Sequence, residues 1–163
     1  MPVPRVQADA VPPPKRWSTD EVSADQGLDY WIGAISEGFL SMRADSCQRR
    51  FHGTLTSARL GAIGVNQVVA DPQRVWRCRR EIARDTQRNC YLIGNLDAAW
   101  QIRQDGRSAT VHRGDFVLVD SRRPYQFLFD ASVHCISLEL PLSWVTRWIA
   151  APEAHVVLAP MPL

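Results

Sequence analysis

The sequence predicts a mainly β domain, a sandwich or a barrel, with an amphipathic helix at each end. Short apolar runs follow one another from Phe51 onward at intervals of ~8–12 residues, separated by turn-forming polar residues. Before and after these runs, apolar residues recur at steps of three and four, as they do on one face of a helix. A chain of 163 residues is long enough for one such domain with a buried core.

Composition narrows the class of protein further. Apolar residues make up 45% and charged residues 22% of the chain, which is ordinary globular usage. The net charge of +2 is too small to indicate a nucleic-acid surface by itself. No apolar run approaches the ~20 residues of a membrane-spanning helix, so we expect no membrane partner. The four cysteines (Cys47, Cys78, Cys90 and Cys135) form no C-x-x-C pair, and we expect free thiols in a cytoplasmic protein.

The N-terminal part divides into an arm and a helix. Residues 1–16 contain five prolines and scattered charges, so we expect a disordered or polyproline-like arm. The run Ser23-Ala-Asp-Gln26 then has the spacing of a helix capping box. The apolar stripe after it should pack on a sheet, and it consists of Leu28, Trp31, Ile32, Ile35, Phe39 and Met42.

The central region carries the strand signals. Asp105-Gly106 is a favoured two-residue hairpin turn between two of the runs, and Gly114 marks the next turn. Pro124 begins a later strand, where its missing N–H costs little. The predicted strands lie within residues 54–55, 60–70, 75–82, 90–96, 99–104, 108–112, 116–119, 125–129 and 134–140.

The C-terminal part predicts a second helix and a linker. Pro141 is a good first helical residue, and the helix after it contains two tryptophans, more than a lone surface helix needs. We therefore expect this helix to cap the β domain or to pair with a second copy of the chain, through Trp144, Val145, Trp148 and Ile149. Residues 151–163 are rich in proline and alanine, and we expect them to begin a linker to a further domain.

Several short motifs, in this order and spacing, resemble the N-terminal domain of AraC-type transcription regulators. They are Tyr30-Trp31, Arg77-x-Arg79-x-x-Ile82-Ala83, Cys90-Tyr-Leu-Ile, Trp100-Gln-Ile-Arg-Gln-Asp-Gly-Arg107, Gly114-Asp115, Asp120-Ser-Arg-Arg-Pro-Tyr125 and Leu138-Glu-Leu-Pro141. The resemblance covers roughly residues 17–150. It implies a cupin-like jelly-roll β-barrel that binds a small-molecule effector, or forms a homodimer, and so controls a separate DNA-binding domain. DNA would be contacted only through that C-terminal domain, which is not in this chain.

The sequence departs from the pattern of metal-dependent cupins. Gly106-x5-His112-x-Gly114 is close to the second cupin motif, with His112 where proline is usual. Tyr125 follows Pro124 where a metal cupin would offer a histidine, and the four histidines are scattered along the chain. A His-and-carboxylate site needs ligands that converge from adjacent strands. We therefore expect no metal and no cofactor.

Polar and aromatic residues on otherwise apolar strand faces are the candidates for contact with an effector. One of the arginines near Val75 could project inward and bind an anionic effector bidentately. A one-residue slip in register would invert every strand face, so core packing remains the alternative for each candidate. The candidate ligand-binding residues are Arg77, Tyr91, Asn95, Trp100, Phe127 and His134.

The run Asp120–Tyr125 is predicted to be a corner of the scaffold. Asp115 and Asp120 are suited to accept nearby backbone N–H groups at successive turns. Arg122 or Arg123 could pair with Asp120; the alternative is that one of them faces a ligand carboxylate or the DNA-binding domain.

No enzyme signature stands out. Gly-x-Ser-x-Gly, the P-loop pattern and His-Glu-x-x-His are absent, so we expect no catalytic residues. Two alternatives to a sensor domain stay open at this point. One is a free-standing, metal-dependent cupin enzyme, and the other is a module that binds a protein partner through the helix containing Trp144 and Trp148.

Overall fold

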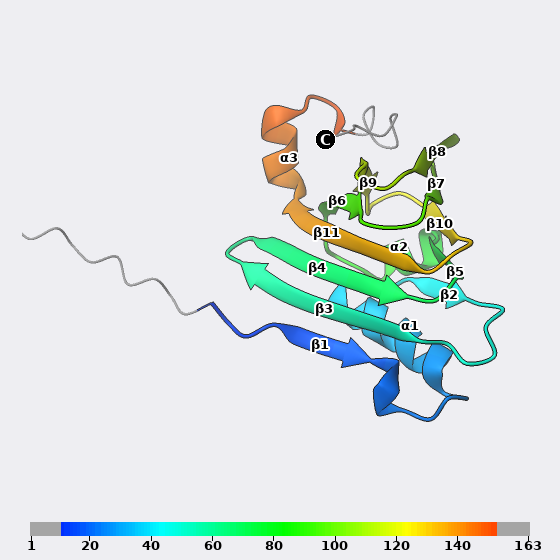
Figure 1. The fold of residues 1–163 in the computed structure, drawn as a ribbon. Helices are drawn as coiled ribbons and strands as arrows, with labels where there is room; N and C mark the ends of the chain where they lie inside the picture. Colours follow the sequence, from blue (N-terminus) through cyan, green and yellow to red (C-terminus); the bar gives the residue numbers. More distant parts are fainter. Residues whose placement is uncertain (1–10, 153–163) are drawn as a thin grey trace, which may run out of the picture.

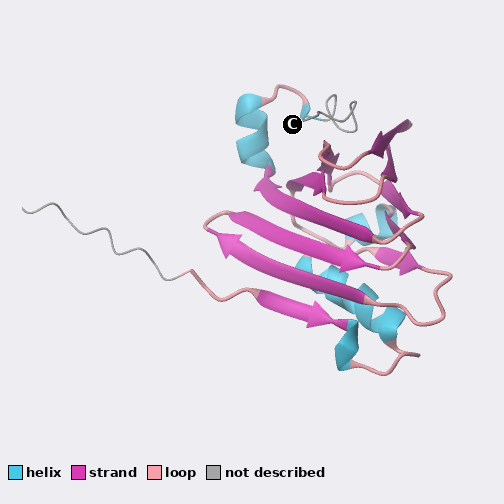
Figure 2. Cartoon of the chain, viewed as in Figure 1, coloured by secondary structure: helices cyan, strands magenta, loops and turns pink. Residues whose placement is uncertain are grey.

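Two antiparallel sheets, packed face to face, make up most of the computed structural model, which describes residues 11–152 (Figures 1 and 2). The six-stranded sheet has the order β1 (Lys15–Ser18), β3 (Gly53–Leu60), β4 (Ile63–Ala70), β11 (Val133–Pro141), β6 (Asn89–Asn95) and β9 (Phe116–Asp120). The five-stranded sheet has the order β2 (Arg43–Asp45), β5 (Gln73–Arg77), β10 (Tyr125–Phe129), β7 (Trp100–Gln104) and β8 (Arg107–Val111). The predicted mainly β, jelly-roll fold is confirmed, with the two sheets remaining separate rather than closing into one continuous barrel.

The turns follow from residues that accept unusual backbone angles. Asp105 and Gly106 join β7 to β8 with φ of 52° and 72°, which confirms the predicted hairpin. Gly114, with φ of 89°, precedes β9. The run 60–70, predicted to be a single strand, contains a turn. Gly61, with φ of 61°, reverses the chain after β3, so that β4 returns beside β3 and pairs with it.

Helix α1 (Gly27–Gly38) lies behind β3 in Figure 1 and packs against β3 and β2. Its Trp31 and Ile35 are buried, as the apolar stripe predicts. Trp31 reaches the sheet because Gly53 has no side chain; a Cβ there would lie 2.7 Å from Trp31 Cε3. The helix begins later than its predicted cap, since the Ser23 hydroxyl hydrogen-bonds the Gln26 side chain at 3.0 Å and not a backbone amide.

Three other segments differ from the sequence prediction. Strand β1 starts at Lys15, so two residues of the predicted arm pair with β3. Strand β2 was not predicted, because three residues are too few for an alternating pattern to be recognised. The run 75–82 is not one strand: β5 ends at Arg77 and helix α2 (Arg79–Ala83) follows, begun by the Glu81 carboxylate accepting the Cys78 backbone N–H at 3.1 Å.

Two short helical elements complete the described fold. A 3₁₀ turn, η1 (Thr19–Glu21), precedes α1, and α3 (Leu142–Trp148) continues directly from β11 and stands at the end of the six-stranded sheet (Figure 1). Across residues 11–152, no helix is long and apolar enough to span a membrane. The predicted arm up to residue 10 and the predicted linker from residue 153 lie outside the described residues.

Candidate functional site: a cavity between the sheets

A cavity of about 70 Å³ lies between the two sheets and α1. Both sheets face it because alternate side chains of each strand point inward. Its position inside a β-sandwich is one where such folds hold small ligands. The residues that line it are Trp31, Ile35, Phe39, Met42, Val68, Gln73, Val75, Tyr91, Ile93, Trp100, Val119, Tyr125, Phe127, Phe129, Cys135 and Ser137.

The five-stranded sheet gives the cavity an aromatic wall. The Trp100 ring lies 5.7 Å from the Phe127 ring in an edge-on arrangement and 5.5 Å from the Phe129 ring. Tyr125 and Phe127 are 5.2 Å apart. Rings at these separations and tilts pack favourably and hold one another in place. The wall therefore presents a continuous apolar surface to the cavity.

Three polar atoms in this lining have no hydrogen-bond partner among the described residues. They are the Tyr91 hydroxyl on β6, the Trp100 indole N–H on β7 and the Ser137 hydroxyl on β11. All three residues are at most 3% exposed, so solvent does not reach them from outside. A buried polar group without a partner costs free energy, and native proteins leave few of them. Three such atoms in one cavity indicate a site that hydrogen-bonds a bound molecule.

Other polar groups in the cavity already have partners. The Trp31 indole N–H donates to Gln73 Oε1 at 2.8 Å, and the Tyr125 hydroxyl donates to Met42 Sδ at 3.0 Å. The contrast with Trp100 shows that the fold can satisfy an interior indole where it needs to. The unpartnered groups are therefore a property of particular positions and not of the whole interior.

Burial keeps the titratable groups of the cavity neutral. It raises the pKa of the Tyr91 and Tyr125 hydroxyls well above their usual range, and that of the Cys135 thiol to about 12. At neutral pH these groups are therefore uncharged. The hydroxyl of Tyr91 is a hydrogen-bond donor as well as an acceptor in this state.

A fourth unpartnered polar side chain lies beside the cavity on the inner face of the same sheet. Asn66 on β4 is 1% exposed, and neither its Oδ1 nor its Nδ2 has a hydrogen-bond partner among the described residues. It stands directly opposite Ser137 in the β4–β11 pairing. Side chains so paired have Cβ atoms about 5 Å apart. Asn66 and Ser137 thus form a polar strip across two strands.

Of the six predicted ligand-binding residues, the structure brings three to the cavity. Tyr91, Trp100 and Phe127 line it together. Arg77, Asn95 and His134 do not, and each has a separate structural explanation. Binding by the first three stays a prediction, while their convergence on one space is observed.

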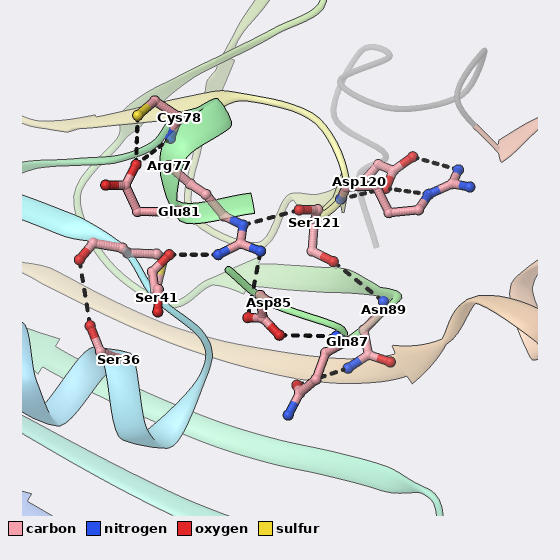
Figure 3. Close-up of polar contacts among 12 residues, drawn as sticks. Ser36, Ser41, Arg77, Cys78, Glu81, Asp85, Gln87, Asn89, Asp120 and Ser121 are labelled. Atoms are coloured by element: carbon pink, nitrogen blue, oxygen red, sulfur yellow. Dashed lines mark hydrogen bonds and ion pairs between the residues drawn. The ribbon is translucent and has the colours of Figure 1, made fainter. Parts of the chain in front are cut away.

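Arg77 is buried at a corner outside the cavity lining (Figure 3). Its Nε donates to the Ser121 carbonyl at 3.1 Å and one terminal nitrogen donates to the Ser41 carbonyl at 2.6 Å. Its other terminal nitrogen lies 3.5 Å from Asp85 Oδ2. The guanidinium therefore joins three segments of the chain. Arg77 does project inward, on the same face of β5 as Val75, but there it bonds groups of its own chain, and binding of an anionic effector stays a prediction.

Asn95 and His134 are placed by the pairing of their strands. The Asn95 amide donates to three backbone carbonyls, at 2.9 Å to Val111 and to Ala98 and at 3.3 Å to Asp97, so it fastens the end of β6. His134 lies on the outer face of β11, with its Nε2 3.0 Å from Gln67 Nε2. Neither lines the cavity. On β11 the inward positions are those of Val133, Cys135, Ser137 and Glu139, the less apolar of the two faces.

The predicted corner at Asp120 is confirmed in its geometry and is more buried than expected. Asp115 accepts the His112 N–H at 2.9 Å, and Asp120 accepts the Arg122 N–H at 2.9 Å. Asp120 is 0% exposed and receives two further hydrogen bonds from the Arg122 guanidinium, at 3.0 and 2.8 Å. Arg123 pairs with Asp105 at 2.9 Å. Both arginines therefore bind carboxylates of their own chain.

Helix α3 presents its two tryptophans outward. Trp148 is 88% exposed and Trp144 is 45% exposed, whereas Val145 is buried against the sheet. Ile149 ends the helix, half-buried. Val145 is therefore unavailable to a partner, and the predicted partner face reduces to Trp144 and Trp148 with Ile149 at its edge.

No group of three or more His, Cys, Asp or Glu side chains within residues 11–152 is arranged to hold a metal ion. His52 and Asp20 come within 3.9 Å of each other on the surface, and His155 lies outside the described residues. The cavity lining contains no histidine or carboxylate at all.

The sequence did not predict Ser137 in the cavity or Asn66 beside it. Each is a polar residue in a strand, and which face of the strand it occupies is known only once the register is known. The signal available was a serine within the alternating run 134–140, but the alternation there favours the face of Ile136 and Leu138, which points outward.

Sequence comparison gives the family. The profile of the AraC-binding-like domain matches residues 31–160. A curated relative, an uncharacterized protein in the nit 5′ region of Bacillus sp. (strain OxB-1), is 33% identical over 128 residues, which cover 77% of this chain and 49% of that protein. The chain belongs to the AraC-binding-like domain family, and it spans about half the length of this relative.

One solved structure has the same fold over most of this chain. The AraC-like transcriptional activator CuxR superposes with a TM-score of 0.72 at 14% identity, covering 83% of this chain and 49% of CuxR. At that identity the likeness concerns the fold alone. A putative ethanolamine utilization protein, EutQ of Salmonella typhimurium LT2, gives a TM-score of 0.45 at 14% identity over 55% of this chain and 70% of EutQ.

Proposed function

We propose that this chain is the sensor domain of an AraC-type transcription regulator, acting in the cytoplasm. It binds a small-molecule effector between its two sheets and controls a separate DNA-binding domain. The observation that carries the proposal is the cavity with unpartnered polar atoms, in a chain of the AraC-binding-like family. A ligand that hydrogen-bonds those atoms binds the folded state alone and therefore stabilises it.

A domain-fusion experiment tests this function with the chain as it stands. The 163 residues are fused to a DNA-binding domain that binds its operator only as a dimer, upstream of a reporter gene. Expression that changes with added small molecules supports a sensor. Expression that stays at the level of the unfused DNA-binding domain under every condition contradicts both effector sensing and self-association.

Self-association is proposed to use α3, because its exposed Trp144 and Trp148 are large apolar side chains on one short helix. Two such side chains covered by a second copy would become the anchors of an interface. Replacing Trp148 by serine should then shift the protein from dimer to monomer in sedimentation velocity. Leu60, which is also exposed but lies in the β3–β4 hairpin, is the matched control, and Leu60→Ser should leave the sedimentation coefficient unchanged.

We propose a sensor and not an enzyme. The cavity lining supplies no carboxylate, histidine or lysine to act as an acid or base, and its titratable hydroxyls and thiol are held neutral by burial. Such a lining is suited to binding and unsuited to proton transfer. Unchanged recovery of a bound ligand after prolonged incubation, measured by mass spectrometry, is the expected result; conversion of the ligand would contradict it.

A further inference from the structure

We propose that the cavity binds an uncharged molecule, with its apolar body against Trp100 and Phe127 and its polar group hydrogen-bonded by the Tyr91 and Ser137 hydroxyls. This inference rests on the proposed sensor function and specifies the chemical class of the effector. Three features of the cavity lead to it: the charge of the lining, the unpartnered polar atoms and the volume.

The lining contains no aspartate, glutamate, lysine, arginine or histidine. An ion moved from water into such a space loses its hydration and meets no counter-charge, which is strongly unfavourable. Ionic groups do occur nearby along the same strands, but they are engaged. Glu139, two residues beyond Ser137, accepts a hydrogen bond from Asn89 Nδ2 at 2.8 Å and pairs with Arg59 at 3.5 Å. Arg77, two residues beyond Val75, is held by two carbonyls and Asp85.

The unpartnered atoms describe the polar group of the ligand. The indole N–H of Trp100 can only donate, so the ligand must offer it an acceptor oxygen or nitrogen. The hydroxyls of Tyr91 and Ser137 can donate or accept. Tyr91 on β6 and Ser137 on β11 lie on adjacent paired strands of one sheet. Ser137 is opposite Ile93, so the two hydroxyl-bearing residues are offset by two positions along the strands. Trp100 faces them from the other sheet. A neutral carbonyl, amide or hydroxyl group satisfies this set.

The volume limits the size. About 70 Å³ is roughly half of a ~150 Å³ cavity known to admit benzene. The ligand is therefore a short chain, or a single ring accommodated by small shifts of the aromatic wall. Together these features point to small neutral amides, alcohols and ketones, and away from acids, amines and phosphates.

Compounds of one shape but different charge test the proposal directly. Benzamide, benzoate and benzamidine form one such set, and propionamide and propionate form a smaller pair. Binding is measured on the whole chain by thermal shift and by calorimetry, up to millimolar concentrations. We expect the amides to raise the melting temperature, and the anions and the cation to bind at least about tenfold more weakly.

Three cavity variants locate the binding. Tyr91→Phe, Ser137→Ala and Trp100→Phe each remove one unpartnered polar group while keeping most of the apolar volume. Each should weaken amide binding by about tenfold. The matched controls are Tyr30→Phe, whose hydroxyl donates to Glu21 at 2.9 Å outside the cavity, and Trp148→Phe on α3. Both controls should bind the amides as the unaltered chain does.

The free protein supplies a second readout. Because the Tyr91 hydroxyl has no partner among the described residues, Tyr91→Phe should leave the melting temperature unchanged or higher without ligand. A lower melting temperature would show that the hydroxyl has a structural role and would count against the proposal. Charged compounds binding as well as the amides would overturn the neutral-ligand inference while the sensor function stands. A panel in which no amide binds would overturn the neutral-ligand inference, and the reporter fusion would then test the sensor function separately.

Discussion

Replacing Arg77 by methionine should destabilise the domain by about 3–5 kcal/mol, the cost of breaking a buried ion pair by removing one partner. Its side chain is 1% exposed and bonds the carbonyls of Ser121 and Ser41 as well as Asp85. Methionine fills similar space but leaves two carbonyls without donors and one carboxylate without its counter-charge. Asp85 is 15% exposed and keeps some contact with water, which places the expectation in the lower part of the range.

Urea denaturation at 25 °C measures this change in the free energy of unfolding. An unchanged slope of that free energy against urea concentration shows that the denatured state is the same. The melting temperature should fall by about 2–4 °C for each kcal/mol in a domain of this size. Arg74→Met is the control, because Arg74 lies on the same strand but points outward and is exposed. It should change stability by less than about 0.5 kcal/mol.

Adding Asp85→Asn to Arg77→Met removes the carboxylate that the first change leaves unpaired. The double variant should therefore be more stable than the sum of the two single changes predicts, and the difference measures the coupling of the pair. A loss below about 1 kcal/mol for Arg77→Met, or a loss equal to that of Arg74→Met, would refute the interpretation of Arg77 as a buried clamp.

Two further predictions concern packing and titration. A Cβ at Gly94 would lie 2.6 Å from Phe116 Cε1, so Gly94→Ala should destabilise the domain by about 1–3 kcal/mol in the same urea assay. The control is Gly33→Ala, in open space on α1, which should stabilise the domain by up to about 1 kcal/mol. Equal effects of the two substitutions would contradict this prediction. Because burial raises the pKa of Cys135 to about 12, iodoacetamide at pH 8 should alkylate exposed Cys47 and spare Cys135, as peptide mass spectrometry will show. Equal alkylation of the two thiols at pH 8 would contradict this expectation. The pKa of Cys135 in the folded state lies above the ordinary value of 9.0, so the neutral thiol contributes its full stability below about pH 9, and that contribution is lost as the pH rises toward 12.

Local chemistry explains which parts of the fold were predictable from the sequence. The Asp105-Gly106 hairpin and the Asp120 corner depend on a few adjacent residues, whose conformational preferences act within the turn itself. Strand β2 and helix α2 depend on partners far along the chain. β2 is a strand because β5 pairs with it, and α2 begins where Glu81 caps the Cys78 amide. Neither leaves a periodic pattern in the sequence.

Register decides which residues of the site could be predicted. Tyr91, Trp100 and Phe127 are large aromatic residues, and burying their area favours the register that turns them inward, where the structure places them. His134 and Ser137 occupy opposite faces of β11, and a shift of one residue would exchange them. The apolar pattern of that strand favoured the face of Ile136, which is the half-buried outer face, and so it pointed to His134 where the structure places Ser137 in the cavity.

Hydrogen-bond partners, more than burial, separate the scaffold from the site. Asn95, Gln104 and Asp120 are each at most 2% exposed and so are as buried as the unpartnered cavity residues, but each of the three bonds backbone groups at a strand end. These hydrogen bonds hold the strand ends in place, and they occupy polar atoms that could otherwise bond a ligand. Tyr91 and Ser137 lie in mid-strand, where the backbone is fully paired within the sheet and offers their side chains no partner. A polar residue in that position is unfavourable for stability alone, and a bound molecule that supplies the missing hydrogen bonds would account for its presence.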